Sequence, residues 1–252
     1  MSTNNLVGRV TGKPSFAQSF NELRAAQKTK KGVPLYSLYI NRPAGRLVAA
    51  ALRNSALTPN HVTLAGAVLT YGALLWLAFG AGTDPGSALI GVILAVGFIL
   101  DSADGQLARL QGRSSRLGEW LDHVLDSGRI VMLHGSVFCF LTRTTTLPTL
   151  PVAVLCGVFL FASSIIFFAG ALFDQLSRHS APPLTADKRG TGGSLRRSAL
   201  MLPVDYGVTC LMLVTVPWVG IFLSIYAAVA FSHCLFGVAY VAKCFRALAR
   251  MG

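Results

Sequence analysis

Six long apolar stretches dominate the chain and restrict what it can fold into. They lie near residues 61–81, 87–110, 116–142, 149–175, 197–217 and 219–243. A helix needs about 20 apolar residues to cross a hydrocarbon core roughly 30 Å thick, and each stretch is long enough. Charged residues make up only 13% of the chain, whereas a soluble domain carries about 25%. The pattern predicts an all-α polytopic membrane protein with six transmembrane helices.

Two further segments precede the first apolar stretch. Residues 1–34 are polar and basic, and we expect them to form an N-terminal arm. Residues 35–56 mix aromatic and aliphatic side chains with Arg42, Arg46 and Arg53. This mixture favours an amphipathic helix lying in the membrane interface, with arginines that reach lipid phosphates. An ordinary soluble amphipathic helix is the alternative. Residues 57–252 would then form the membrane domain.

Basic residues alternate between the two sides of the predicted membrane. Nine precede the first span, whereas the first and fifth connections carry none and the third carries only Arg143. The positive-inside rule therefore predicts an integral protein of the cell membrane with both termini in the cytoplasm. The net charge is +12. In so apolar a chain, this charge favours membrane lipids and a phosphate-bearing substrate as partners, and not nucleic acid.

Four aspartates occupy two neighbouring predicted spans. Asp101 and Asp104 are three residues apart, and Asp122 and Asp126 are four apart, so each pair shares one helix face. A short basic turn joins the two helices, so the faces can meet. Carboxylates at membrane depth are costly, and four of them cannot all stay ionised without cations. Because oxygen ligands suit Mg²⁺, Mn²⁺ or Ca²⁺, the sequence predicts a divalent metal site that could orient a diphosphate.

Small residues flank these aspartates. Gly105, Ala108 and Gly118 would let a nucleotide approach the helix backbone closely, although close helix packing also uses small residues. Arg109 lies at the expected membrane edge, where its guanidinium could pair with a phosphate or a carboxylate.

The stretch from Asp101 to Asp126 resembles the signature of the CDP-alcohol phosphotransferases, D-x2-D-G-x2-A-R-x8-G-x3-D-x3-D. The segment TPNHVTL, residues 58–64, and the six-span layout are also similar to that family. The first 34 residues are not part of the resemblance. All eight fixed positions of the signature match: Asp101, Asp104, Gly105, Ala108, Arg109, Gly118, Asp122 and Asp126.

The resemblance implies a role for each matched position. It implies that Asp126 is the general base that takes the proton of the acceptor hydroxyl, with CMP as the second product. It also implies a homodimer and two metal ions, Mg²⁺ or Mn²⁺, held by Asp101, Asp104, Asp122 and Asp126. The implied CDP-binding residues are Asp101, Asp104, Gly105, Ala108, Arg109, Gly118 and Asp122.

The substrates are less constrained than the reaction. The first hypothesis has CDP-diacylglycerol as donor and a small polar alcohol or a sugar-alcohol phosphate as acceptor. The alternative has a soluble CDP-alcohol as donor and a lipid or glycan hydroxyl as acceptor. In the fourth connection, Arg189, Arg196 and Arg197 could hold an anionic acceptor, although positive-inside charge explains them equally well. The active site is expected at the cytoplasmic surface, where the aspartates and basic loops coincide.

Two other interpretations concern the acidic residues within spans. A divalent cation transporter would distribute them along a pathway, but here they cluster at one end of two spans. A non-catalytic scaffold would pair each acid with a base, but the acids outnumber the bases inside the spans. Asp205 interrupts the fifth predicted span, where a lone carboxylate is costly. It is expected to pair with an arginine or to line an acceptor pocket with Tyr206.

Overall fold

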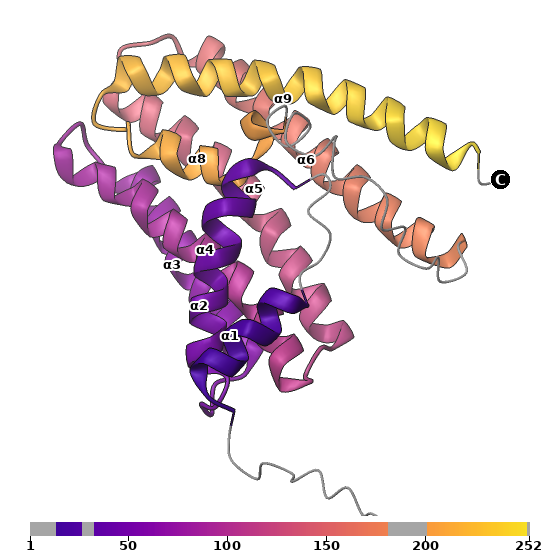
Figure 1. The fold of residues 1–252 in the computed structure, drawn as a ribbon. Helices are drawn as coiled ribbons and strands as arrows, with labels where there is room; N and C mark the ends of the chain where they lie inside the picture. Colours follow the sequence, from indigo (N-terminus) through magenta and orange to yellow (C-terminus); the bar gives the residue numbers. More distant parts are fainter. Residues whose placement is uncertain (1–13, 27–32, 181–200, 251–252) are drawn as a thin grey trace, which may run out of the picture.

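The structure is a computed structural model that describes residues 14–26, 33–180 and 201–250 of the 252-residue chain (Figure 1). Within these ranges the chain forms helices, turns and loops and no strand. The α-helices are α1 (Phe16–Ala25), α2 (Arg42–Leu52), α3 (Pro59–Phe79), α4 (Leu89–Gln111), α5 (Arg116–Thr144), α6 (Thr149–Ser180), α8 (Tyr206–Leu213) and α9 (Val219–Leu248). A π-helix, η1 (Ser37–Asn41), and two 3₁₀ helices, η2 (Pro85–Ala88) and η3 (Leu202–Val204), complete the set.

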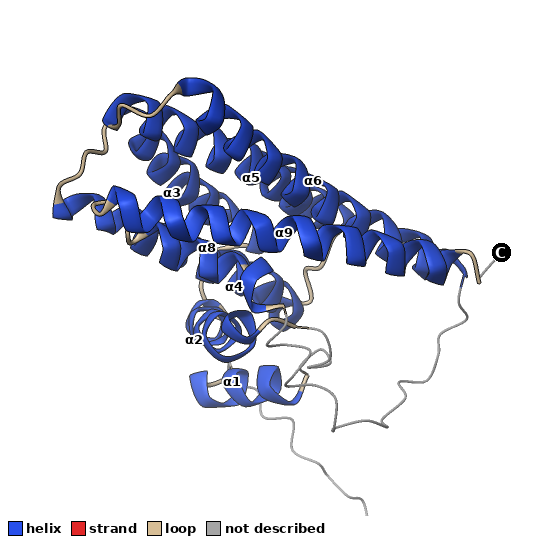
Figure 2. Cartoon of the chain, turned by 90° about the horizontal axis from the view of Figure 1, so that it is seen from above, coloured by secondary structure: helices blue, strands red, loops and turns tan. Residues whose placement is uncertain are grey.

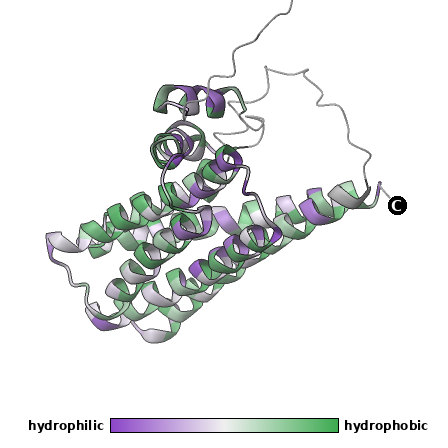
Figure 3. Ribbon diagram, turned by 90° about the horizontal axis from the view of Figure 1, so that it is seen from below, coloured by the Kyte–Doolittle hydropathy of each residue, from purple (hydrophilic) through white to green (hydrophobic). Residues whose placement is uncertain are grey.

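Five helical segments in the described part are long and apolar enough to cross a membrane. Figure 3 shows hydrophobic colouring over much of their length and a mixture of hydrophilic and hydrophobic colouring on α1. The two longest helices, α6 and α9, pack side by side and extend beyond the rest of the bundle (Figure 1). The all-helical membrane architecture predicted from the sequence is therefore confirmed. The five segments are Pro59–Phe79, Pro85–Gln111, Arg116–Thr144, Thr149–Ser177 and Val219–Leu248.

The predicted fifth span, 197–217, is not a spanning helix in the part of the chain that the structure describes. Residues 197–200 lie outside that part, and the remainder consists of η3, the 8-residue α8 and a series of turns. Eight residues give a helix only about 12 Å long. The break comes at Asp205, whose backbone is extended and whose side chain caps α8 by accepting from the Gly207 N–H at 3.1 Å. The prediction of six spanning helices is therefore not confirmed.

Asp205 also ties the C-terminal half of the chain to the N-terminal half. It is buried, and its two carboxylate oxygens accept hydrogen bonds from the Ser37 N–H at 2.9 Å and the Ser37 hydroxyl at 2.8 Å. The predicted arginine partner is therefore replaced by Ser37 of η1. A buried carboxylate that accepts three hydrogen bonds has the partners it needs. Asp205 has a structural role and holds α8 against η1.

The N-terminal helices stack on the outside of α4. Figure 2 shows α1 as the outermost helix, lying against α2, and α2 packs on α4. Arg46 is buried with its guanidinium 5.2 Å from the centre of the Phe20 ring, and Arg53 pairs with Glu22 at 2.6 Å. Two of the three arginines predicted to reach lipid phosphates are therefore held by α1. The interfacial placement of the 35–56 helix is not confirmed.

Glycines let the helices around α4 approach closely. A methyl group built on Gly97 would collide with the hydroxyl of Thr70, and one on Gly66 would lie 3.2 Å from the carbonyl oxygen of Gly97. On another side of α4, a methyl on Gly91 would lie 2.5 Å from both the Cys210 carbonyl oxygen and the Val214 nitrogen. Small residues thus fix α4 between α3 and α8.

We expect Gly91→Ala to destabilise the protein, because the backbone atoms that it would meet cannot move aside as a flexible side chain could. The free energy of unfolding should fall by about 1–3 kcal/mol, the usual effect of overpacking. Thermal denaturation in detergent measures this loss. Gly72→Ala on α3 is the control, since a methyl there meets nothing within 4 Å. Equal melting temperatures for the two variants would contradict the close packing of α4 on α8.

Candidate active site

The turn between α4 and α5 sets the depth of the four aspartates. Gly112 ends α4 in the left-handed conformation with φ of 64°, which favours glycine. Ser115 begins α5 by accepting a hydrogen bond from the Gly118 N–H at 3.0 Å. Asp101 lies ten positions before the last residue of α4, and Asp126 lies ten positions after the first residue of α5. The two helices therefore bring their aspartates to the same level.

Three of the four predicted metal ligands come together. Asp101, Asp122 and Asp126 each offer a carboxylate oxygen, and these oxygens lie within 4.8 Å of one another. All three side chains are partly buried. Clustered carboxylate oxygens are suitable ligands for a hard divalent cation such as Mg²⁺ or Mn²⁺. The donor set therefore fits the metal centre expected from the sequence.

Asp104 lies outside that group and is held by α3. Its Oδ2 accepts a hydrogen bond of 2.5 Å from the hydroxyl of Thr63, and the Asp104 side chain is buried. The same hydroxyl approaches the Pro59 carbonyl oxygen at 3.1 Å. Thr63 belongs to the TPNHVTL segment that the sequence analysis singled out, although no role was predicted for it. Its position indicates that the start of α3 orients this aspartate.

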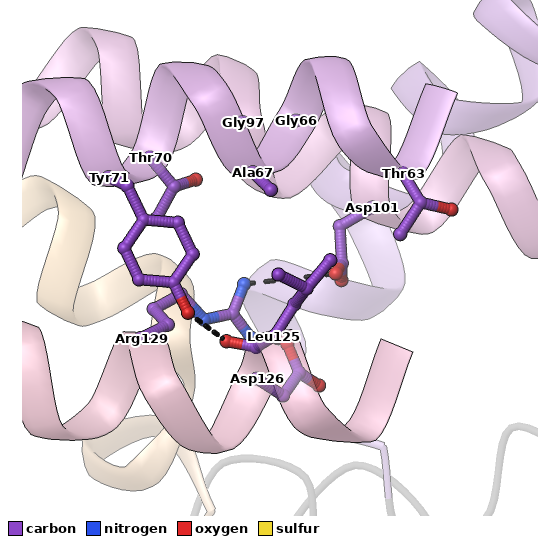
Figure 4. Close-up of a pocket in the computed structure, with 10 residues that line it drawn as sticks. All are labelled: Thr63, Gly66, Ala67, Thr70, Tyr71, Gly97, Asp101, Leu125, Asp126 and Arg129. Carbon is purple, nitrogen blue, oxygen red and sulfur yellow. Dashed lines mark hydrogen bonds and ion pairs between the residues drawn. The ribbon is translucent and has the colours of Figure 1, made fainter. Parts of the chain in front are cut away.

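Arg129 is part of the site, and the sequence analysis missed it. Its Nη2 lies 2.5 Å from Asp126 Oδ1, and its Nη1 lies 3.9 Å from Asp101 Oδ1 (Figure 4). The guanidinium also lies 4.1 Å from the centre of the Tyr206 ring, a cation–π contact. The available signal was its spacing: Arg129 follows Asp126 by three residues and so shares its helix face. A cation inside an otherwise apolar span requires a partner.

A small cavity of about 20 Å³ lies beside Asp101 and Asp126, with room for about one water molecule. On one side Tyr71 donates a hydrogen bond of 2.8 Å to the Leu125 carbonyl oxygen, which ties α3 to α5 (Figure 4). The cavity is lined from α3, α4 and α5 by Thr63, Gly66, Ala67, Thr70, Tyr71, Gly97, Asp101, Leu125, Asp126 and Arg129.

A second cavity of about 220 Å³ lies on the other side of Arg129, between α5, α6, α8 and α9. Its polar lining includes Ser163, Thr209 and His233. Within the described residues, Arg129 Nε and Tyr206 Oη line this cavity, are buried and have no hydrogen-bond partner. Because buried polar groups in proteins are almost always paired, these two atoms point to a polar occupant of the cavity.

The small residues predicted to contact a nucleotide lie in different surroundings. A methyl built on Gly105 would meet nothing within 4 Å, so the α4 backbone is accessible there. A methyl on Gly118 would lie 3.4 Å from Asn60 Oδ1, which brings α3 against the start of α5. Ala108 is partly exposed and Arg109 is exposed. Arg189, Arg196 and Arg197, the predicted acceptor residues, lie outside the described residues.

The comparison with known families supplies the remaining observation. A model of the CDP-alcohol phosphatidyltransferase family matches residues 56–233. The chain belongs to that family. The matched region contains the four aspartates, Arg129 and the start of α3. The family resemblance predicted from the aspartate signature is therefore confirmed.

Curated relatives match shorter parts of the chain. The archaetidylinositol phosphate synthase of Pyrococcus horikoshii is 36% identical over 87 residues, which cover 34% of this chain and 43% of the relative. The protein of the same name from Aeropyrum pernix is 35% identical over 92 residues, which cover 36% and 44%. A bifunctional IPC transferase and DIPP synthase of Aquifex aeolicus is 42% identical over 69 residues, which cover 27% and 15%. The chain thus spans less than half the length of these relatives.

Proposed function

We propose that the chain transfers a phosphatidyl group from CDP-diacylglycerol to a hydroxyl of a small polar acceptor and releases CMP. The observation that carries the proposal is the carboxylate cluster of Asp101, Asp122 and Asp126, which lies within the region matched by the family. Two relatives are named archaetidylinositol phosphate synthase. Those names favour a sugar-alcohol phosphate, such as an inositol phosphate, within the class of acceptors expected from the sequence.

Asp126 is the proposed general base. One of its oxygens, Oδ1, is bound by Arg129, which leaves Oδ2 to take the proton of the acceptor hydroxyl. The acceptor oxygen then forms a bond to the phosphorus that carries the donor alcohol. The bond from that phosphorus to the oxygen of CMP breaks, and CMP leaves with the electron pair. The proton stays on Asp126 until it is released to solvent.

The proposed metal centre consists of two divalent ions, Mg²⁺ or Mn²⁺, held by Asp101, Asp104, Asp122 and Asp126. When bound, such ions would neutralise the donor diphosphate and the charge that develops on the leaving phosphate. The three clustered carboxylates support this assignment. Both oxygens of Asp104 accept hydrogen bonds, from the Thr63 hydroxyl and the Gly105 N–H, so Asp104 would bind a metal through a remaining lone pair of one of them. Gly105, Ala108, Arg109 and Gly118 are the proposed surface for the cytidine nucleotide. The accessible backbone at Gly105 supports that role.

The acceptor is proposed to reach Asp126 from the cavity beyond Arg129. Hydroxyl and imidazole groups line it, and its unpaired Tyr206 hydroxyl can bond to a polyol. Arg189, Arg196 and Arg197 remain the proposed contacts for an acceptor phosphate. Both termini and the active site are proposed to lie in the cytoplasm. The protein is also proposed to form a homodimer. The basic residues that alternate with the spans support the orientation.

Release of CMP by the purified protein tests the proposal. The assay supplies Mg²⁺ and CDP-diacylglycerol and compares glycerol phosphate, serine, inositol and inositol phosphate as acceptors. We expect the rate of CMP release to depend on which acceptor is supplied and to be highest with inositol phosphate. A second series supplies a soluble CDP-alcohol with a lipid acceptor. CMP release only in that second series would overturn the assignment of a lipid donor. If CMP is released in neither series, the proposed transfer reaction is wrong.

A further inference from the structure

A polar cavity of about 180 Å³ lies between α1, α2 and α4, and two arginines line it. Arg42 comes from α2 and Arg109 from α4. The other lining residues are Leu23, Ala26, Ser102, Gly105 and Gln106, so no acidic side chain among the described residues lines the cavity. The described lining is therefore positively charged, and Asp104, which is not part of the lining, is the acid that interacts electrostatically with Arg109.

Within the described residues, Arg42 and Arg109 form no ion pair or cation–π contact like those of Arg46 and Arg53. Arg46 contacts Phe20 and Arg53 pairs with Glu22, whereas no ion pair involves Arg42 or Arg109 in the described part of the chain. Burial, and then the charge of Arg109, lower the pKa of Arg42. Two guanidinium groups that line the same cavity repel each other, and an anion between them would relieve that repulsion. Their joint placement favours an anionic ligand.

The backbone around the cavity is fixed. Gln106 Nε2 donates a hydrogen bond of 3.1 Å to the Arg42 carbonyl oxygen, which anchors the start of α2 to α4. One turn further along α2, a methyl on Gly45 would lie 2.9 Å from the Ser102 hydroxyl, so the two helices are in close contact. Arg42 is therefore positioned by α4, the helix that carries Asp101 and Asp104.

The cavity adjoins the carboxylate face of α4. Gly105 lies four residues after Asp101 and four before Arg109, so these three positions form one continuous strip along the helix. Gly105 lines the cavity and leaves its backbone accessible. A ligand lying over Gly105 would have the aspartates on one side and the two guanidinium groups on the other.

We infer that Arg42 and Arg109 jointly bind a phosphate group in this cavity and that this phosphate belongs to the CDP-alcohol donor. Guanidinium groups hold phosphate oxygens through charge-assisted and often bidentate hydrogen bonds. Arg42 lies outside the region matched by the family, residues 56–233. Helix α2 thereby completes the donor site from a segment that precedes the family domain. The choice of donor rests on the proposed function, whereas the anion site itself does not.

Isothermal titration calorimetry of CDP binding tests the inference. The protein is held in neutral-lipid nanodiscs with Mn²⁺ present. We expect Arg42→Met to weaken CDP binding by about 10-fold to 100-fold, the usual loss when one hydrogen-bonding partner of a charged group is removed. Arg42→Lys should weaken it less, because the charge remains while the bidentate geometry is lost. Arg113→Met is the matched control, because it removes an equal charge near the same end of α4 without lining the cavity.

Two outcomes would overturn the inference. If Arg42→Met leaves CDP affinity unchanged but abolishes the rise in melting temperature that phosphatidylglycerol nanodiscs cause, a lipid headgroup occupies the site. If Arg42→Met changes neither the affinity for CDP nor the rise in melting temperature that phosphatidylglycerol nanodiscs cause, the cavity binds no phosphate. Binding is measured without turnover, so protein that binds CDP yet releases no CMP would refute the proposed function alone.

Discussion

Asp126→Asn is expected to lower the rate of CMP release by about a thousandfold or more while the protein stays folded. The amide keeps an oxygen that can accept the hydrogen bond from Arg129, but it cannot take a proton from the acceptor hydroxyl. Removing a general base usually lowers the rate by about 10²-fold to 10⁴-fold. The substitution also removes one negative charge from the carboxylate cluster. CMP release at saturating substrate, with circular dichroism of the same sample, measures both effects.

Asp84→Asn provides the control for Asp126→Asn. Asp84 caps η2 in the connection between α3 and α4, accepts from the Gly86 N–H at 2.9 Å and does not belong to the carboxylate cluster. Its variant should keep turnover. If Asp126→Asn keeps turnover near that of the unsubstituted protein, another group is the base, and Asp101 and Asp122 are the carboxylate candidates of the same cluster. Mn²⁺ binding separates a lost base from a lost metal ligand.

The core of the site follows from local spacing, which is why it could be predicted. The spacings within Asp101–Asp104 and Asp122–Asp126 fix each pair on one helix face. The short turn between the helices fixes their relative depth, because Asp101 and Asp126 are equally distant from it along the chain. Helix periodicity and a tight antiparallel connection therefore bring distant carboxylates together without any knowledge of the remaining packing.

Features that depend on contacts between distant segments could not be predicted. Asp205 interrupts the predicted span and begins α8, and Ser37, far away in sequence, supplies two hydrogen bonds to its buried carboxylate. Arg46 and Arg53 turn towards α1 because Phe20 and Glu22 lie there. Hydropathy describes only the average polarity of a segment, so it predicted a spanning helix where one buried carboxylate divides the chain.

Arg129 depends both on local spacing and on a contact between distant segments. Its substitution should lower the stability of the protein and raise its affinity for metal. Its spacing from Asp126 was visible in the sequence, whereas its contact with Asp101 on α4 was not. In the absence of metal, the guanidinium is the cation that compensates Asp126 and Asp101. Removing one partner of a buried ion pair costs about 3–5 kcal/mol, because the remaining charge is left unpaired. The metal-free protein should therefore melt at a markedly lower temperature as Arg129→Met.

The same substitution should tighten metal binding, because a fixed positive charge beside the carboxylates opposes a divalent cation. Removing one unit charge a few ångströms away should increase Mn²⁺ affinity by about tenfold or more, even with a high effective dielectric. Electron paramagnetic resonance of free Mn²⁺ measures the affinity, and thermal denaturation with and without Mn²⁺ measures the compensation. Arg143→Met is the matched control on α5, since Arg143 bonds to the Ala78 and Ala81 carbonyl oxygens and not to the aspartates.

The control should lose stability without gaining Mn²⁺ affinity, whereas Arg129→Met should do both. Weaker Mn²⁺ binding in Arg129→Met would contradict electrostatic competition and would mean that Arg129 chiefly orients the Asp126 carboxylate for the metal. The two roles make opposite predictions because orientation and charge act in opposite directions on the same ligand. A purely structural arginine would lower the melting temperature and leave the affinity unchanged. The sign of the change in Mn²⁺ affinity therefore determines how the buried arginine and the carboxylates of α4 and α5 work together.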